Sequence, residues 1–371
     1  MGSVNEGSVL AEMLHHRAVG LAPGEPVALP LVSASMYFLP GVPDAPFQYG
    51  RSGGPTWSAL EEALGILEQA EVIVFPSGMA AIQAVLMTRL SPGDRVLVPS
   101  DGYYNTRTLL KDFLAPLGIR YDLCATHDYA DRDFGGYALV YVETPSNPAL
   151  DVCDIADVAA RAHAAGALVV VDNTTMTPLG QRPLDLGADL VVASDTKAPG
   201  GHSDALLGHV AARDGSLLDP VRRWRTVSGA IPGQLETWLV HRGLESLEVR
   251  FDRMCASAGV LAERLAGHAA VTGVAYPGLE AHPDRAVVRR QMLRCGSLVG
   301  VTLESARAAE AFIDGARFVV PTTSFGGTHT TAERRARWGD DVAEGFVRLS
   351  VGCEPVEALW ADLVHALDAV C

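Results

Sequence analysis

Lys197 is the residue of this sequence with the clearest potential for chemistry. Only two of the 29 lysine and arginine residues are lysines, Lys111 and Lys197, so arginine supplies nearly all of the positive charge. Lys197 follows an apolar run at 190–193 and lies in the segment SDTKAPGGH, residues 194–202. An amine can condense with an aldehyde and a guanidinium cannot, so this pattern predicts a Schiff-base lysine at the end of a buried strand. The alternative is an ordinary surface lysine, which is our interpretation of Lys111.

An acid and an anion-binding turn complete a set of groups that suits one cofactor. Asp172 follows the apolar residues 169–171, and a Ser-Gly-Met turn at 77–79 joins a predicted strand to a predicted helix. Pyridoxal phosphate needs a lysine for its aldehyde and an acid that keeps its ring nitrogen protonated. Its phosphate needs N–H groups at a helix N-terminus, to which the hydroxyls of Ser194 and Thr196 can add. Each feature also has a structural alternative, because Asp and Ser commonly cap turns and helices.

Two other phosphate-binding patterns are absent from the sequence. No G-x-G-x-x-G follows an early strand, and no G-x-x-x-x-G-K-[ST] occurs. The sequence therefore lacks the fingerprints of nicotinamide binding and of a P-loop.

Short apolar runs alternate with helical patterns over residues 60–210. Strands are predicted at 71–75, 95–98, 137–142, 167–171 and 190–193, and helices at 77–90 and 154–165. Uninterrupted apolar strands are typical of a mainly parallel sheet covered on both faces, so we expect an α/β fold. Polar residues follow three of these strands, at 143–148, 172–174 and 194–197. We expect them to converge on one site, because ligands of open α/β sheets bind beyond the carboxyl ends of the strands.

The predicted organisation is an arm followed by two domains. Residues 1–48 are rich in Pro and Gly and predict an N-terminal arm without a core of its own. Residues 49–235 would form the cofactor-binding α/β domain. Residues 215–250 contain Pro220, Gly229, Pro232 and Gly233 and suggest a connection leading into a helix at 236–250. Helices at 252–267, 306–315 and 356–370, with a strand at 297–303, predict a smaller α+β domain over residues 236–371.

Composition narrows the possible partners. The net charge of −15 and the absence of a basic block argue against nucleic acid and anionic membranes, which favours a small-molecule ligand. The six cysteines are scattered, so neither a metal site nor a disulfide framework is expected. Residues 1–20 have no apolar signal region, and no apolar stretch reaches 18 residues. We expect a cytoplasmic protein.

Nine short motifs resemble those of the Cys/Met-metabolism family of pyridoxal-phosphate enzymes. This family includes cystathionine γ-lyase, cystathionine γ-synthase, cystathionine β-lyase and methionine γ-lyase. The resemblance extends over residues 48–369 and implies a fold type I enzyme with a large cofactor domain and a smaller C-terminal domain. In chain order the motifs are YGRSGGPT (49–56), SGMAA (77–81), ETPSNP (143–148), VDNT (171–174), SDTK (194–197), GHSD (201–204), RGL (242–244), YPGL (276–279) and RLSVG (348–352).

The resemblance implies a cofactor role for each matching residue. Lys197 would bond covalently to the cofactor and then shuttle protons. Asp172 would pair with the ring nitrogen, Asn147 with the ring hydroxyl, and Tyr103 would stack on the ring and assist proton transfer. The phosphate would be held by Gly78, Met79, Ser194 and Thr196.

The resemblance also implies substrate and subunit contacts. Arg348 would clamp the substrate α-carboxylate, for which the planar guanidinium is well suited. Asn147, Thr330 and His329 would be further substrate-binding positions. Tyr49 and Arg51 would reach the phosphate of a neighbouring subunit, which implies shared active sites in a homotetramer, a dimer of dimers.

Several positions depart from the family pattern where the substrate side chain would bind. His329 and Thr330 stand where many members carry Glu-Ser, and Ala198 stands where an aromatic residue is common. Tyr104 and Asn105 replace the usual Gly-Gly, and Thr175 stands where Phe is typical. None of these changes removes cofactor chemistry, but they leave the substrate open.

The expected activity is γ-elimination from a sulfur-containing or O-acylated amino acid, which releases a 2-oxo acid, ammonia and a thiol. The alternative is γ-replacement, as in cystathionine γ-synthase or an O-acylhomoserine sulfhydrylase. Methionine γ-lyase is disfavoured, because Asn105 stands where that subgroup usually has Cys. A cofactor-binding protein without turnover is disfavoured by the presence of Lys197, Asp172, Tyr103 and Arg348 together.

Overall fold

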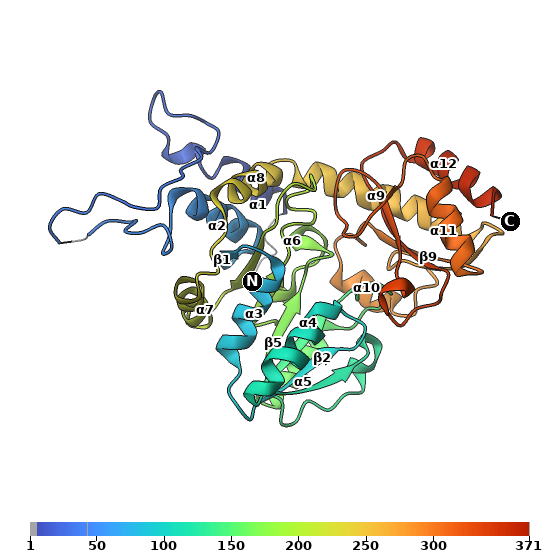
Figure 1. Ribbon diagram of the computed structural model, residues 1–371, viewed down its shortest axis with the longest axis horizontal. Coiled ribbons are helices and arrows are strands. Elements are labelled where there is room, and N and C mark those ends of the chain that lie inside the picture. The colour runs from blue at the N-terminus through green and yellow to red at the C-terminus, as the bar shows by residue number, and fades with distance from the viewer. Residues whose placement is uncertain (1–5, 43, 371) are drawn as a thin grey trace. The chain divides into compact units, whose positions relative to one another are not determined.

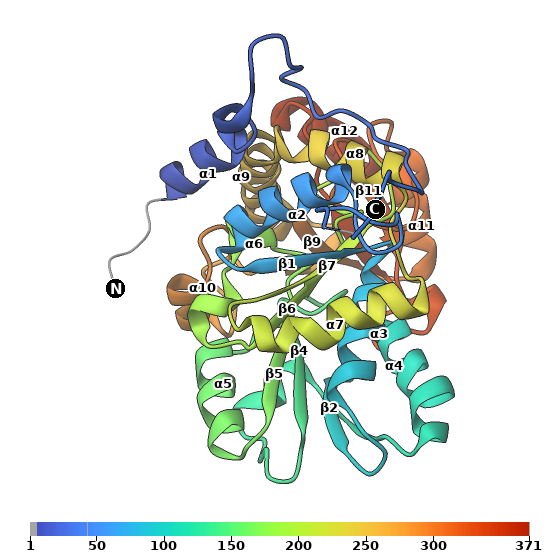
Figure 2. The same ribbon diagram turned by 90° about the vertical axis from the view of Figure 1, so that its left-hand side faces the viewer.

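The computed structural model describes residues 6–42 and 44–370 (Figures 1 and 2). The chain divides into two compact units, one made of Met1–Ser91 and Asp189–Glu248, the other of Pro92–Ala188 and Val249–Cys371. Each unit therefore combines two separate stretches of sequence. Among the described residues, no helix is both long enough and apolar enough to span a membrane.

The first unit contributes three strands to the larger sheet. They lie in the order β1, β7, β6, and β7 runs antiparallel to both neighbours. Helix α2 packs against β1, and Figure 2 shows the two side by side. The bounds are α1 Glu6–His15, α2 Pro55–Glu68, β1 Glu71–Phe75, α3 Gly78–Arg89, β6 Leu190–Ala193, β7 Gly208–Ala212, α7 Gly215–Ser228 and α8 Gln234–Leu244.

The second unit contributes four parallel strands to this sheet, in the order β5, β4, β2, β3. Helix α5 packs against β5. The register places Glu143, the last residue of β4, beside Asp172, the last residue of β5. The bounds are β2 Arg95–Pro99, α4 Tyr104–Leu109, β3 Arg120–Cys124, β4 Leu139–Glu143, α5 Ile155–Ala164, β5 Leu168–Asp172 and α6 Thr177–Gly180.

A smaller sheet with its own core follows in the second unit. Its strands lie in the order β10, β11, β12, β9, β8 and are mainly antiparallel. The core beneath it includes Leu261, Phe312, Val347 and Leu363. The bounds are α9 Leu247–Ala266, β8 Val271–Ala275, α10 Arg285–Gln291, β9 Leu298–Leu303, α11 Ala306–Gly315, β10 Val320–Pro321, β11 Thr331–Arg334, β12 Phe346–Ser350 and α12 Val356–Asp368.

The structure confirms the α/β class, with a mainly parallel larger sheet and a smaller second sheet. It also confirms the helix predicted after β1, because the Ser77 hydroxyl accepts a hydrogen bond from Ala80 N at 3.1 Å and so caps α3. Asp154 caps α5 in the same way, accepting from Ala156 N at 3.1 Å. These caps use local side chains, which is why the sequence reveals them.

The prediction of a connection starting at residue 215 is wrong, because residues 215–228 form α7. Asp214 caps this helix by accepting from Ser216 N at 2.9 Å, and Leu218, Val221 and Arg225 are buried along one side. Pro220 lies inside the helix, so the sequence analysis gave this proline too much weight. The predicted helix at 236–250 also differs from the structure, because α8 ends at Leu244 and a separate helix, α9, begins at Leu247.

The predicted arm contains a helix that the sequence analysis missed. Helix α1 buries Val9 and Met13 and packs against α2. The predicted domain boundaries at residues 48 and 235 stay a prediction.

Candidate active site

Lys197 lies in a tight loop that follows β6 in the first unit. Its backbone N donates to Ser194 O at 3.2 Å, and its carbonyl accepts from Gly201 N at 2.8 Å. Gly200 N donates to Asp195 O at 2.8 Å, which closes a second turn of the same loop. The Lys197 side chain remains partly exposed. The amine is thus carried by a segment whose backbone is held on both sides of the lysine.

Helix α8 packs closely against this loop. A Cβ added to Gly243 would lie 2.5 Å from Pro199 O and 2.6 Å from Gly200 O. Real side chains do not approach backbone oxygen atoms this closely, so only glycine fits at this point of α8. Gly243 belongs to the RGL motif, whose role the sequence alone did not explain.

The N-terminus of α3 lies against the residue that opens the lysine loop. A Cβ on Gly78 would lie 2.8 Å from Ser194 Cβ, and a Cβ on Gly208 would lie 2.5 Å from Gly78 N. Ala81 N donates to Ser77 O at 3.1 Å, so the N–H groups of Gly78 and Met79 precede the first intrahelical hydrogen bond. These two donors at a helix N-terminus, next to a serine hydroxyl, match the needs of a phosphate group. The first unit therefore fits the phosphate and aldehyde ends of pyridoxal phosphate.

The Thr196 hydroxyl already has backbone partners. Its Oγ1 accepts from Leu207 N at 3.0 Å and lies 3.2 Å from Leu207 O, while Thr196 N donates to the same carbonyl at 3.2 Å. The hydroxyl has one proton and two lone pairs, so a contact with phosphate would compete with its bond to Leu207 O. In the structure, Thr196 joins the lysine loop to Leu207, the residue directly before β7.

In the second unit, Asp172 has two fixed hydrogen-bond donors. The Tyr141 hydroxyl donates to Asp172 Oδ2 at 2.9 Å, and Thr174 N donates to Oδ1 at 3.0 Å. Asp172 is buried, as is Glu143 beside it on β4. Burial, and then the charge of Asp172, raise the pKa of Glu143 well above its usual range. The Asp172 carboxyl is therefore fixed in orientation by two donors at the end of β5.

Glu143 also positions Tyr103, a role that the sequence analysis missed. Glu143 Oε2 accepts from Tyr103 N at 2.7 Å, and a Cβ on Gly102 would lie 2.7 Å from the same oxygen. The Tyr103 hydroxyl accepts from Asn105 Nδ2 at 2.9 Å. Burial raises the pKa of Tyr103, so the phenol is neutral near pH 7. The only signal in the sequence was that Glu143 opens the ETPSNP motif.

Arg348 and Asn147 are brought together in the second unit. Arg348 Nη1 donates to Asn147 Oδ1 at 2.7 Å, and Nη2 donates to Ser324 O at 3.1 Å and to Glu333 Oε2 at 3.1 Å. Burial lowers the pKa of Arg348 to about 10, so the guanidinium still carries its charge near pH 7. The Asn147 oxygen is used by Arg348, which leaves its NH₂ group for a cofactor hydroxyl.

Glu333 is a second residue that the sequence analysis missed. It lies opposite Arg348 in the register of β11 and β12. Its carboxylate also accepts from Arg335 Nη1 at 2.7 Å and from Trp338 Nε1 at 2.6 Å. An acid inside the run AERRARW looks like one charge among many, and only the strand pairing reveals its partner.

His329 and Thr330 differ although they are neighbours. Thr330 is fully buried, and its hydroxyl donates to Glu354 Oε2 at 2.7 Å while its backbone N donates to Oε1 at 2.7 Å. His329 is exposed, with Nδ1 3.4 Å from the Thr328 hydroxyl. Thr330 thus shapes its loop through Glu354, whereas the His329 ring is accessible.

Tyr49 and Arg51 lie in the first unit on an exposed stretch before α2. Arg51 Nη1 donates to Thr226 O at 2.8 Å, and its guanidinium lies 5.4 Å from the centre of the Tyr49 ring. Both side chains are exposed. They are accessible for a contact with another molecule.

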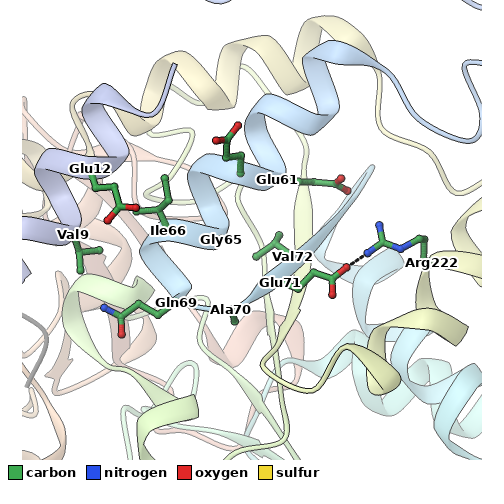
Figure 3. Close-up of a pocket in the computed structure, with 11 residues that line it drawn as sticks. Val9, Glu12, Glu61, Gly65, Ile66, Gln69, Ala70, Glu71, Val72 and Arg222 are labelled. Atoms are coloured by element: carbon green, nitrogen blue, oxygen red, sulfur yellow. Dashed lines mark hydrogen bonds and ion pairs between the residues drawn. The ribbon is translucent and has the colours of Figure 1, made fainter. Parts of the chain in front are cut away.

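An open cavity of about 560 Å³ lies elsewhere in the first unit, between α1, α2 and β1 (Figure 3). Figure 3 shows Glu71 paired with Arg222 at one side of it and Glu12 of α1 at another. None of the predicted site residues lines this cavity. This cavity is therefore not the candidate active site, although it is large.

Comparison with known proteins identifies the family of the chain. The model of the Cys/Met metabolism PLP-dependent enzyme family matches residues 24–368. A Streptomyces coelicolor protein assigned provisionally as a cystathionine gamma-lyase is 49% identical over 351 residues, covering 93% of this chain and 89% of that protein. A cystathionine beta-lyase of Lactococcus lactis is 36% identical, covering 92% of this chain and 94% of that protein.

Among solved structures, cystathionine gamma synthase from Xanthomonas oryzae pv. oryzae, in complex with aminoacrylate and cysteine, superposes with a TM-score of 0.93. It is 33% identical, and the match covers 100% of this chain and 99% of that one. The chain therefore belongs to the Cys/Met metabolism family of PLP-dependent enzymes, and pyridoxal 5'-phosphate is its cofactor.

Proposed function

We propose that this enzyme catalyses γ-elimination on cystathionine or a similar amino acid, releasing a 2-oxo acid, ammonia and a thiol. The observation that carries this proposal is the 49% identity, over 93% of the chain, to a protein assigned provisionally as a cystathionine gamma-lyase. The 36% identity to a cystathionine beta-lyase also favours cleavage of a carbon–sulfur bond.

We propose that the cofactor, when bound, acts as an electron sink for the carbanion formed at the substrate Cα. Lys197 would hold the cofactor covalently and later carry a proton between substrate carbons on its Nζ. The α3 N-terminus, with Gly78 and Met79, would bind the phosphate, together with Ser194 and Thr196. The fixed, buried carboxylate of Asp172 would keep the ring nitrogen protonated.

The remaining groups would orient the substrate. Arg348 would bind the substrate α-carboxylate, with Asn147 alongside as a contact for the cofactor hydroxyl. Tyr103, held by Glu143, would stack on the cofactor ring and move a proton through its neutral hydroxyl. These roles are chemically consistent with a charged Arg348, whose pKa remains about 10 despite burial, and with a neutral Tyr103, whose pKa burial raises.

We infer that His329 contacts the distal end of the substrate, beyond the scissile bond, and that Thr330 acts only by shaping its loop. An exposed imidazole can accept a distal carboxylate that the usual glutamate would repel. Replacing His329 with Glu should therefore lower kcat/KM for cystathionine relative to methionine. A ratio that changes less than a few fold would contradict this assignment.

We also propose a homotetramer in which Tyr49 and Arg51 reach the site of a neighbouring subunit, and a location in the cytoplasm. Both side chains are exposed, which suits an intersubunit contact. Five cysteines of the described chain are free thiols, as expected in a reducing compartment.

A direct assay separates elimination from replacement. Purified enzyme is supplied either with cystathionine alone or with O-succinylhomoserine and cysteine, and ammonia, 2-oxo acid and cystathionine are measured. Release of ammonia and 2-oxobutyrate from cystathionine supports the γ-lyase, and release of pyruvate would indicate a β-lyase. Net synthesis of cystathionine with little release of ammonia would instead favour γ-replacement. The structurally similar protein of Xanthomonas oryzae is named as a cystathionine gamma synthase. No turnover in either mixture would leave a cofactor-binding protein.

The same preparation tests the cofactor lysine. Borohydride reduction and peptide mapping should place the pyridoxyl group on Lys197, and K197A should lack it. A label on Lys111 would overturn the assignment of the site.

A further inference from the structure

A buried histidine lies between two buried carboxylates in the first unit, next to the Lys197 loop. His209 on β7 is 1% exposed, Asp195 after β6 is 0% exposed, and Glu68 at the end of α2 is 4% exposed. His209 Nδ1 lies 2.8 Å from Asp195 Oδ1, and Nε2 lies 3.3 Å from Glu68 Oε1. Asp195 is two residues before Lys197. We call these three residues the Glu68–His209–Asp195 triad.

The geometry of the triad favours a charged ring. A neutral imidazole has one N–H group and could donate to only one of the two carboxylates, whereas an imidazolium donates to both. Burial alone would lower the pKa of His209, but the two carboxylates more than offset this effect and raise it to about 10. Within the described part of the chain, Asp195 and Glu68 are the charged groups that act on this ring.

The triad is not arranged as a metal site. Both ring nitrogens face carboxylate oxygens, so neither lone pair is available to a metal ion. Over residues 6–42 and 44–370, no group of His, Cys, Asp and Glu is placed to hold one. A buried set of charges is also weak evidence for stability alone, since well-packed apolar residues often serve as well. The triad therefore calls for another role.

The triad is joined to the lysine loop through the start of β7. Asp195 bonds to His209 through its side chain, and Thr196 bonds to Leu207 through its backbone and its hydroxyl. Of the two residues that precede Lys197, Asp195 is thus tied to β7 and Thr196 to Leu207, the residue directly before β7. A shift of β7 would therefore move Lys197.

The start of β7 also borders the proposed phosphate-binding turn, residues 77–79. Gly208 lies between Leu207 and His209, and a Cβ there would be 2.5 Å from Gly78 N. Ser194 also lies close to Gly78, because a Cβ on Gly78 would be 2.8 Å from Ser194 Cβ. On α2, Glu68 contacts Nε2 of the His209 ring. Helix α2 packs on β1, and β1 pairs with β7. One buried ring thus connects the helix α2, the lysine loop and the strand that abuts the α3 N-terminus.

We propose that the Glu68–His209–Asp195 triad is a charged positioning device that holds the Lys197 loop and the phosphate-binding turn in register, and so sets the affinity and geometry of the bound cofactor. In this proposal the three residues act through the loop. This inference rests on the proposed role of Lys197.

The test compares variants on the same helix. E68Q keeps the shape of Glu68 but removes one charge of the triad, and H209Q removes the imidazolium. E61Q is the matched control, because Glu61 also lies on α2 and pairs with a buried cation, Arg225. The readouts are the dissociation constant of pyridoxal phosphate from apoprotein and the absorbance of the bound cofactor as a function of pH.

We expect E68Q and H209Q to bind pyridoxal phosphate at least about tenfold more weakly than E61Q. This is the scale on which binding weakens when a residue that orients a ligand-binding residue is removed. We also expect their absorbance titrations to move away from that of the wild type, while E61Q keeps the wild-type titration. The proposal is wrong if either triad variant binds pyridoxal phosphate less than about tenfold more weakly than E61Q. It is also wrong if E61Q shifts the absorbance titration as much as the triad variants do, because the triad would then serve folding only.

A second measurement covers variants that fail to fold. In the wild-type holoenzyme, nitrogen NMR of labelled histidine should show one buried ring protonated on both nitrogens at neutral pH, and D195N, if folded, should lose that signal. Only singly protonated histidines in the wild type would overturn the proposal. An error in the role of Lys197 would appear separately, as a borohydride label elsewhere in the wild type.

Discussion

Arg348 shows how the buried surroundings of a single residue define its chemistry. Its guanidinium is held by Asn147, Ser324 and Glu333, and the neighbouring strand supplies Glu333 directly opposite. Because burial lowers its pKa only to about 10, it remains a cation in the assay range. A fixed buried cation of this kind is suited to a substrate carboxylate.

We predict that R348A raises KM for the amino-acid substrate by roughly 10²–10³-fold, because removing one partner of a buried charge pair costs about 3–5 kcal/mol. The absorbance of the bound cofactor should be unchanged. R337A is the control, since Arg337 also contacts Glu333, at 3.3 Å, but is largely exposed. An unchanged KM in R348A would mean that the carboxylate binds elsewhere.

His209 gives a prediction for stability against pH. Its pKa is raised from 6.5 to about 10 in the folded protein. The folded state therefore binds more protons than the unfolded state between these values. The stabilisation is complete below pH 6.5 and is lost as the pH rises toward 10. Urea unfolding should show that the difference in stability between wild type and H209Q shrinks from pH 6.5 to pH 10; a difference that grows with pH would contradict a charged ring.

At the scale of elements, close backbone contacts join two helices to the lysine loop. Gly243 of α8 touches the carbonyls of the lysine loop, and Gly78 of α3 touches Ser194. These contacts leave no room for a Cβ, so glycine is required by packing at both positions. Helix capping by Ser77 fixes where α3 begins and hence where its free N–H groups lie.

We predict that G243A destabilises the protein by about 1–3 kcal/mol and weakens cofactor binding, because the added methyl group would press on Pro199 O and Gly200 O. G259A is the control on another helix. A Cβ there meets nothing closer than 3.9 Å, so this substitution should be neutral or stabilise by about 0.5–1 kcal/mol. Thermal unfolding of apoprotein and holoenzyme measures both effects. Equal effects of the two substitutions would show that the loop contact is unimportant.

At the scale of the whole molecule, the arm exposes apolar side chains that a second copy of the chain could cover. Met36 is 78% exposed and Phe38 is 90% exposed, near Tyr49 and Arg51 in the sequence. Isolated apolar residues on a surface are ordinary, but a cluster on an extended arm is typical of an interface. This feature supports the proposed intersubunit role of Arg51.

We predict that R51A and K197A are each inactive and that refolding them together restores part of the activity. A mixed dimer with a shared site contains one site with both wild-type residues. The control is each variant refolded alone at the same concentration, and activity of the mixture is compared with theirs. Hybrids shown by mass spectrometry to form but to remain inactive would exclude the shared site.

The sequence by itself determined the family, the cofactor and most of the elements that carry candidate site residues. Lys197, Asp172 and the Ser-Gly-Met turn could be recognised because strand ends, caps and glycine turns depend on residues close together in the chain. The same local signals failed at α7, where burial of one helix face outweighed Pro220. Local patterns therefore predict where an element carries a functional group, but less reliably whether a proline ends a helix.

Only the tertiary structure decided which partners hold these residues. Glu333 lies opposite Arg348 through strand register, Glu143 holds Tyr103, and His209 joins Glu68 to Asp195. His209, for example, is 14 residues from Asp195 and 141 residues from Glu68 in the chain, so no local pattern marks these partners. Their charge states also depend on burial, which raises the pKa of Glu143 and lowers that of Arg348. Long-range pairing and desolvation are properties of the packed molecule, and for that reason they were not visible in the sequence.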